Sequence, residues 1–140
     1  LLRTAPRADM FLAAHLLRAA SLRLDRAILR GAGGVEPLGL ANMTDAVNGV
    51  PAVNGATLSH AHTREALRRI GSANAADAST MWVTTPEVRE LMQAREVVAT
   101  TGRFLCEDDR VLNRPLRATP EAPAATIVGG DWSASLVGLW

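Results

Sequence analysis

Residues 79–92, STMWVTTPEVRELM, decide the fold of this chain, because an apolar run there passes directly into the start of a helix. In an extended strand, Met81 and Val83 would face one side of a sheet and Trp82 the other, so both faces would carry large apolar groups. Burial on both faces predicts a strand in the centre of a sheet.

The signals after this strand predict a helix that begins at Pro86. Thr85 is a good N-cap residue, and Pro86 suits the first helical position because its missing N–H would be unpaired there anyway. Glu87 and Glu90 would complement the positive end of the helix dipole. A buried strand that turns sharply into a helix is typical of an α/β or α+β core.

A long helix is predicted before this core, over residues 8–30. Apolar residues recur there at helical spacing, and Gly31 is well placed as a left-handed residue that ends the helix. The stripe consists of Met10, Ala13, Leu17, Ala20, Leu24 and Ile28, and a partial second stripe of Phe11, Leu12 and Leu16 broadens it. Such a helix needs partners on more than one side. We expect the core to include Leu17, Leu24, Ile28, Trp82, Val83 and Trp132.

The rest of the chain alternates loops with short elements. Residues 31–55 are rich in glycine and Asn-Gly pairs, which predicts little regular structure. Thr57 is expected to cap a second helix that runs to about Ile70. Strand candidates lie at residues 102–105, 116–119, 126–128 and 135–139, with Gly129-Gly130 as a turn. The predicted fold class is α+β: one long N-terminal helix leading into a mixed sheet flanked by two shorter helices.

Composition and charge narrow the classes of function. The length of 140 residues fits one domain. The net charge is +1 and every basic residue is an arginine spread along the chain, which argues against a broad nucleic-acid-binding or membrane-binding face. No apolar run reaches the ~18–20 residues that span a bilayer. Cys106 is the only cysteine, so a reducing compartment is the natural expectation.

The residues that could carry chemistry do not form a recognisable site. His60 and His62 would point about 200° apart on a helix, which does not suit a shared metal. Ser59 beside His60 lacks an orienting third group and an oxyanion hole. Acidic neighbours should disfavour the Cys106 thiolate, and its segment is expected to be a solvated loop. The glycines at 31–34 follow a helix instead of preceding one, so a phosphate cradle is not expected. We predict no catalytic, cofactor-binding or metal-binding residues and no enzyme activity.

Several short motifs follow one another in a characteristic order. Residues 24–33, LDRAILRGAG, have the form Leu-Asp-x-Ala-x-Leu-x-Gly-x-Gly, and PLGL follows at 37–40. The strand and helix of residues 82–92 come next, then GRFL at 102–105, RPL at 114–116 and VGGDWS at 128–133. In this order and spacing, the motifs resemble those of the major capsid proteins of tailed double-stranded-DNA phages, which have the Hong Kong 97-type capsid fold.

The resemblance implies a division of the chain. Residues 1–30 would be the spine helix of the peripheral domain, and residues 31–140 the axial domain around capsomer centres. The family's N-terminal arm, extended loop and final peripheral strands would be absent from this segment, so the capsid fold would be incomplete.

The resemblance also implies a function: a structural shell protein whose copies form the icosahedral head of a phage or prophage around double-stranded DNA. Its partners would be other copies in capsomers, a scaffold or head protease during assembly, and the packaged DNA by non-specific contact only, with no membrane and no cofactor. It would reside in the virion, and in the host cytoplasm during assembly. The isolated segment is expected to form homo-oligomers. We expect intersubunit contacts at Arg103, Glu107, Asp108, Asp109 and Arg110.

Two alternatives remain at the level of sequence. The shell protein of an encapsulin-like nanocompartment has the same fold but packages enzymes, and neighbouring genes would distinguish it. A small α/β ligand-binding or hydrolytic domain is a third reading. A deep polar pocket containing His60 or His62 beside a carboxylate would favour that reading.

Overall fold

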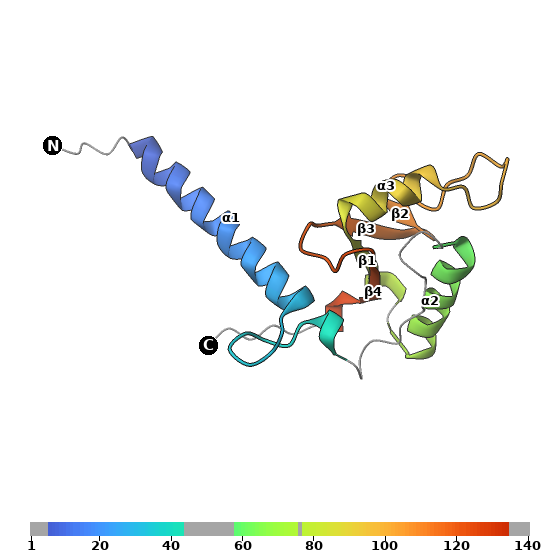
Figure 1. Cartoon of the computed structure of the whole chain (residues 1–140), viewed down its shortest axis with the longest axis horizontal. Helices are drawn as coiled ribbons and strands as arrows, with labels where there is room; N and C mark the ends of the chain where they lie inside the picture. Colours follow the sequence, from blue (N-terminus) through green and yellow to red (C-terminus); the bar gives the residue numbers. More distant parts are fainter. Residues whose placement is uncertain (1–5, 44–57, 76, 135–140) are drawn as a thin grey trace. The chain divides into compact units, whose positions relative to one another are not determined.

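The computed structural model describes residues 6–43, 58–75 and 77–134. The chain divides into two compact units, Leu1–Ala46 and Val47–Trp140. The first contains a long helix, and the second contains a mixed sheet of four strands with two shorter helices (Figure 1). The predicted α+β class is therefore confirmed.

In the first unit, helix α1 spans Pro6–Arg30, and the 3-10 turn η1 spans Leu40–Asn42. The chain folds back after α1, so that the Gly39 N–H donates to the Gly31 carbonyl oxygen at 2.9 Å. The Asn42 side chain also donates to the Gly31 oxygen, at 2.8 Å. These donors satisfy carbonyl groups that a helix end leaves without intrahelical partners. The long helix is confirmed and its last turn is closed by η1.

Gly31 does not adopt the left-handed conformation that the sequence predicted for it. Positive φ values occur instead at Gly33 (84°) and Gly34 (86°). Gly31 is needed for space, because an added Cβ would overlap the carbonyl oxygen of Pro37 and lie only 2.5 Å from that of Ala27. The glycine thus permits a close approach between the end of α1 and the returning chain.

The sheet of the second unit has the order β2-β3-β1-β4. Strand β1 (Thr80–Thr84) pairs in parallel with β3 (Arg114–Ala118) and antiparallel with β4 (Ile127–Asp131), while the short β2 (Arg110–Val111) forms one edge. The central position predicted for residues 81–83 is confirmed. Two helices complete the unit: α2 (His60–Ser72), and α3 (Pro86–Ala94) directly after β1.

The junction between β1 and α3 forms as its sequence predicts. The Thr85 hydroxyl accepts a hydrogen bond from the Val88 N–H at 3.5 Å, and Pro86 occupies the first turn. The Glu87 carboxylate accepts hydrogen bonds from the Glu87 backbone N–H and from the Thr85 hydroxyl. These hydrogen bonds lower the pKa of Glu87. The ionised carboxylate is therefore favoured at the positive end of the helix.

Trp82 is the centre of the core of this unit. It is 1% exposed, and its indole N–H donates to the Val111 carbonyl oxygen at 3.1 Å. The surrounding cluster of buried side chains consists of Leu58, Val88, Met92, Leu105, Cys106, Val111 and Leu116, with Ala66, Leu67 and Ile70 of α2 packed against it. Val83 is also buried, at 8% exposure.

The prediction of a turn at Gly129-Gly130 is wrong, because both residues lie inside β4. Gly129 pairs with Trp82 across the sheet. A Cβ on Gly129 would overlap ring atoms Cζ3 and Cε3 of Trp82 and lie 3.1 Å from Cδ1 of Ile70. Glycine is required at position 129 because the Trp82 indole occupies the space that a side chain there would fill.

Two further predictions change, and a third falls outside the described residues. The second helix begins at His60 with Ser59 as its N-cap, so Thr57, which lies outside the described residues, is not the cap. Residues 102–105 form no strand; Phe104 makes a single bridge to Glu96. The strand expected at 135–139 lies outside the described residues.

The expected core residues of the long helix are not all buried. Leu17 is 70% exposed, Leu24 and Ile28 are half-buried, and the buried residue of this helix is Leu29 at 5% exposure. Leu29 lies beside the turn that closes the helix, whereas Leu17 lies more than three turns away. Trp132 is half-buried, with its indole N–H donating to the Met81 carbonyl oxygen at 3.1 Å.

We expect Gly129→Ala to lower the free energy of unfolding by roughly 1–3 kcal/mol, because the methyl group would overpack the core against the indole. Gly130→Ala is the matched control, since nothing lies within 4 Å of a Cβ at that position of the same strand. Urea denaturation monitored by tryptophan fluorescence gives both values. Equal effects of the two variants would contradict this account of Gly129.

Trp82→Ala should cost about 3–5 kcal/mol of unfolding free energy, as large-to-small changes in a core do. In this background Gly129→Ala should cost less than it does alone, because the clashing ring is gone and residues in contact are not additive. Thermal and urea unfolding of the two single variants and the double variant measure this coupling. A loss below about 1 kcal/mol for Trp82→Ala would show that the core is centred elsewhere.

Candidate functional site

The described residues show no site of the catalytic or metal-binding kind. Within residues 6–43, 58–75 and 77–134, no three His, Cys, Asp or Glu side chains are grouped so that they could hold a metal ion. Over the same residues, no helix is both long and apolar enough to cross a membrane. The features that remain are a pair of residues at the start of α2, a buried thiol, a charged turn and the surface of α1.

Ser59 contacts His62, not the adjacent His60 that the sequence analysis considered. The Ser59 backbone N–H donates to His62 Nδ1 at 3.2 Å, and the Ser59 hydroxyl oxygen lies 2.8 Å from the same atom. The two residues are three apart, with serine at the N-cap and histidine at the third helical position. This is a capping-box geometry with histidine in place of Glu or Gln, so the contact fixes the start of a helix.

Cys106 is buried in the core and is 2% exposed, so the solvated loop expected for its segment is wrong at this residue. Burial, followed by the charge of Asp109, raises the pKa of the Cys106 thiol. Both effects disfavour the thiolate, which is the reactive form of cysteine. The residue acts as a small apolar side chain between α3 and β2.

The turn before β2 carries most of the charged residues predicted to meet a neighbouring subunit. Reciprocal backbone hydrogen bonds join Glu107 and Arg110 at 2.9 and 3.1 Å, and Asp108 and Asp109 between them have φ values of 50° and 53°. The Glu107 carboxylate accepts from the Phe104 N–H at 2.8 Å. The turn is therefore held in shape by its own hydrogen bonds.

The side chains of this turn differ in whether they contact other residues of the described chain. Asp109 lies 3.6 Å from the Arg89 guanidinium of α3, and Arg110 donates to the Asn113 carbonyl oxygen at 3.3 Å. Arg103 belongs to the preceding loop, where its backbone oxygen accepts from the Val97 N–H at 2.7 Å. In the described part of the chain, the side chains of Arg103 and Asp108 have no hydrogen-bond or ion-pair partner.

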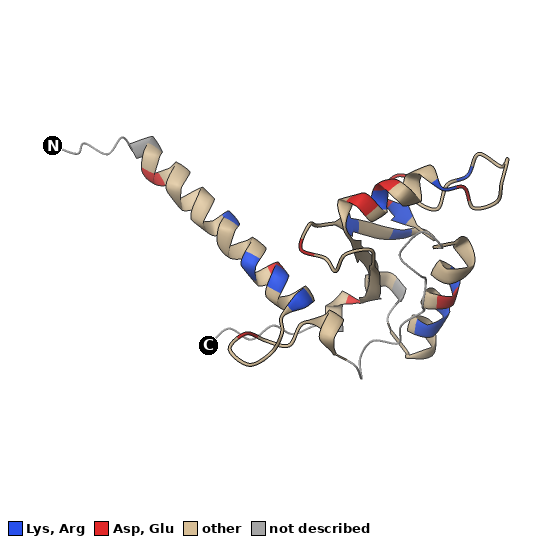
Figure 2. Cartoon of the chain, viewed as in Figure 1, with Lys and Arg blue, Asp and Glu red and all other residues tan. Residues whose placement is uncertain are grey.

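Helix α1 has an exposed apolar surface along its first four turns. The residues concerned are Met10 (75% exposed), Phe11 (69%), Leu12 (60%), Leu16 (63%) and Leu17 (70%). At about 100° per residue, these positions point in directions all around the helix axis. Between residues 10 and 17 the helix carries no Arg, Asp or Glu, and Arg18, Arg23, Arg26 and Arg30 follow toward its C-terminus (Figure 2). A helix that is apolar all round is normally buried.

The sequence analysis missed a polar network that joins the start of β1 to the end of β4. The Asp131 carboxylate accepts hydrogen bonds from the Ser79 hydroxyl at 2.5 Å and from the Ser133 hydroxyl at 2.6 Å. It also accepts from the Ser133 N–H at 3.0 Å. The signal was present in the motif Gly-Asp-Trp-Ser, whose Asp, Trp and Ser all make hydrogen bonds here. The motif has a structural explanation.

A family model described as the phage capsid family matches residues 1–140, the whole of the sequence. No curated protein matches the chain.

The unfolding free energy should fall as the pH rises above about 8.5, because the folded state raises the pKa of Cys106 and the unfolded chain therefore ionises first. The stabilisation is complete below the unfolded pKa and is lost as the pH rises through the folded pKa. The sequence has no Tyr and no Lys, so no other side chain titrates in this range. Denaturation curves between pH 7 and 10.5 should show the decline in the wild type and a flatter profile in Cys106→Ala, and equal slopes would contradict the prediction.

Proposed function

The chain belongs to the phage capsid family, and from that premise we propose that it is a subunit of the icosahedral head of a tailed phage or prophage, enclosing double-stranded DNA. The family is one of structural proteins, so the protein is a structural capsid component of a bacteriophage and not an enzyme. The icosahedral arrangement and the double-stranded DNA are the finer parts of the proposal.

The observation that carries the proposal is the apolar surface of α1. An isolated helix with large apolar side chains on all sides loses favourable burial for each of them. A shell restores this burial between copies, because every subunit presents the same surface to its neighbours. Interfaces that are obligate in this way are large and hydrophobic. The exposed Leu17, which was expected in the core, is therefore assigned to a contact between chains.

We assign the domains of the capsid subunit as the motifs imply. Residues 1–30 are the spine helix, and residues 31–140 form the axial domain. The first compact unit continues to Ala46, because the turn that closes α1 packs against the end of the helix. This turn thus serves as the connection between the two proposed domains.

The charged turn is a second candidate contact between neighbouring copies. Arg103 and Asp108 are exposed, and their side chains have no partner in the described part of the chain. Glu107, Asp109 and Arg110 make contacts of their own, so they fix the shape of the turn that presents Asp108. Opposite charges on one rigid surface suit head-to-tail contacts around a symmetry axis.

Further partners follow from a role in a phage head. A scaffold or head protease would act during assembly in the host cytoplasm, and the mature protein would reside in the virion. No cofactor is needed, because a shell performs no chemistry.

Electron microscopy tests the function directly. The full-length protein, expressed together with its head protease and scaffold, should yield closed shells of uniform size. A preparation that contains only monodisperse monomers would refute the proposal.

The chain by itself should associate as its concentration rises, because α1 exposes apolar surface. Multi-angle light scattering over a 100-fold range of concentration should show the mean mass increasing. Leu12→Gln combined with Leu16→Gln should shift the midpoint of association at least tenfold to higher concentration. Arg23→Gln combined with Arg26→Gln is the matched control, since it alters the same helix and leaves its apolar residues intact. A strictly monomeric wild type would contradict the assignment of α1 to an interface.

A further inference from the structure

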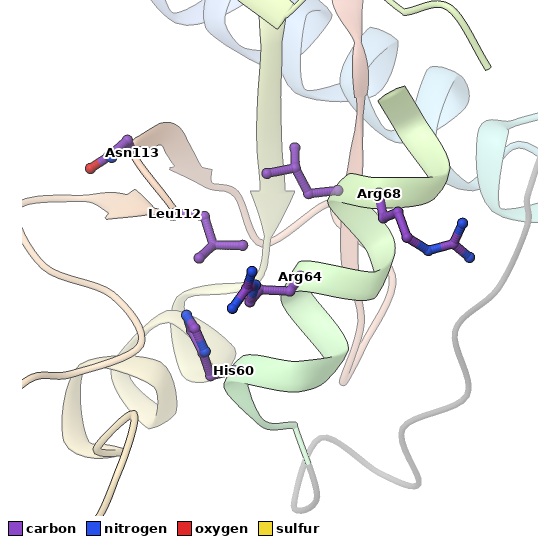
Figure 3. Close-up of a pocket in the computed structure, with 6 residues that line it drawn as sticks. His60, Arg64, Arg68, Leu112 and Asn113 are labelled. Carbon is purple, nitrogen blue, oxygen red and sulfur yellow. The ribbon is translucent and has the colours of Figure 1, made fainter. Parts of the chain in front are cut away.

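An open pocket of about 530 Å³ lies beside α2 in the second unit. The residues that line it are His60, Arg64, Leu67, Arg68, Leu112 and Asn113. In Figure 3, the guanidinium of Arg64 lies beside His60 on the side of the helix that faces Leu112, and the side chain of Arg68 extends away from them. The lining contains no carboxylate, and of its two arginines Arg64 brings its guanidinium to the pocket, because the Arg68 guanidinium is bound to Glu65.

The charge of α2 is unbalanced. The helix carries Arg64, Arg68, Arg69 and a single acid, Glu65. Glu65 binds Arg68 at 2.7 and 2.8 Å and Arg69 at 2.9 Å, and these hydrogen bonds lower the pKa of Glu65 to about 2. The carboxylate is therefore ionised and is already used by two arginines.

Glu65 binds Arg68 and Arg69 but does not neutralise Arg64, the remaining arginine of α2. Its side chain is exposed, and within residues 58–75 and 77–134 no carboxylate pairs with it. His60 occupies the first position of the helix, so the positive end of the helix dipole adds to the charge at the same place. Leu67 and Leu112 are the apolar residues of the pocket lining.

We propose that this pocket binds a phosphate group of a nucleic-acid backbone, and that α2 is the surface through which the shell contacts packaged DNA. Guanidinium groups recognise phosphate oxygens through several N–H donors, and such contacts carry no base specificity. The Asn113 carboxamide is a further donor of the kind that contacts phosphates. The inference rests on the proposed function, since a head shell is what brings DNA against many copies of the pocket.

One such pocket binds DNA weakly, because affinity for the backbone grows with the number of phosphates neutralised. A shell overcomes this weakness by repetition, as each further contact becomes intramolecular once the first is made. The small net charge of the whole chain is compatible with this, because the positive charge of α2 is local. Contact through α2 thus needs no broad basic face.

NMR titration of the ¹⁵N-labelled chain with a 12-base-pair DNA duplex at low salt tests the proposal. Amide shifts should be concentrated at residues 60–68 and at Leu112 and Asn113. The logarithm of affinity should fall linearly with the logarithm of salt concentration, and Arg64→Gln should reduce that slope by roughly 0.9, the value for one lost phosphate contact. Glu65→Gln should have the opposite effect and strengthen binding, because it removes a negative charge beside the pocket and the carboxylate partner of Arg68.

Arg117→Gln is the matched control. It removes the same charge from an exposed position of β3 that does not line the pocket. Equal effects of Arg64→Gln and Arg117→Gln, or shifts that avoid α2, would overturn the proposal. So would equal binding of a poly-glutamate peptide of matched charge, which would assign the pocket to a carboxylate of a protein partner. Shells that form without these shifts would refute only this inference, whereas DNA binding by a protein that never forms shells would refute only the proposed function.

Discussion

The indole of Trp82 against the bare backbone of Gly129 is the contact on which the second unit depends. The ring fills the place of a side chain on β4, reaches Ile70 of α2, and ties β2 through its hydrogen bond to Val111. One side chain of the central strand thus links β4 and β2 of the sheet to the core that α2 covers. The side chains are closely packed here, so a smaller ring or an added methyl group would destabilise the unit. In the observed register of β1 with β4, the indole lies opposite a residue that has no side chain.

Several features that depend on a few neighbouring residues are predicted from the sequence, whereas contacts between distant segments are not. The cap at Thr85 and Pro86, the central strand and the long helix each depend on a few consecutive residues or on one periodicity. Gly31 and Gly129 were both assigned to chain reversals, because glycine most often permits unusual φ values. Each is in fact required by a close approach: Gly31 to Pro37, and Gly129 to Trp82. The spacing of residues in the sequence does not show which atoms of other segments will contact these two glycines.

The surface of α1 shows a related limit. Its apolar stripe is the pattern of a buried face, but periodicity does not say whether the covering atoms belong to the same chain. Leu17 was therefore placed in a core that the described residues do not provide for it. Cys106 shows the reverse error, since its acidic neighbours suggested solvent while its side chain packs inward. Charged residues in a turn determine where their own side chains lie, and leave the direction of the residue before them to the backbone. The pocket beside α2 could not be foreseen, because Leu112 and Asn113 join it from a distant turn.

The position of β1 has a mechanical consequence. The strand is held by a parallel ladder on one side and an antiparallel ladder on the other. A force along the strand loads both ladders in shear, so that their hydrogen bonds resist together, whereas the edge strand β2 is held by one ladder, to β3. A container under internal pressure stretches its walls in their own plane. The strand that the sequence marks most strongly is thus one that resists such a stretch through two ladders at once.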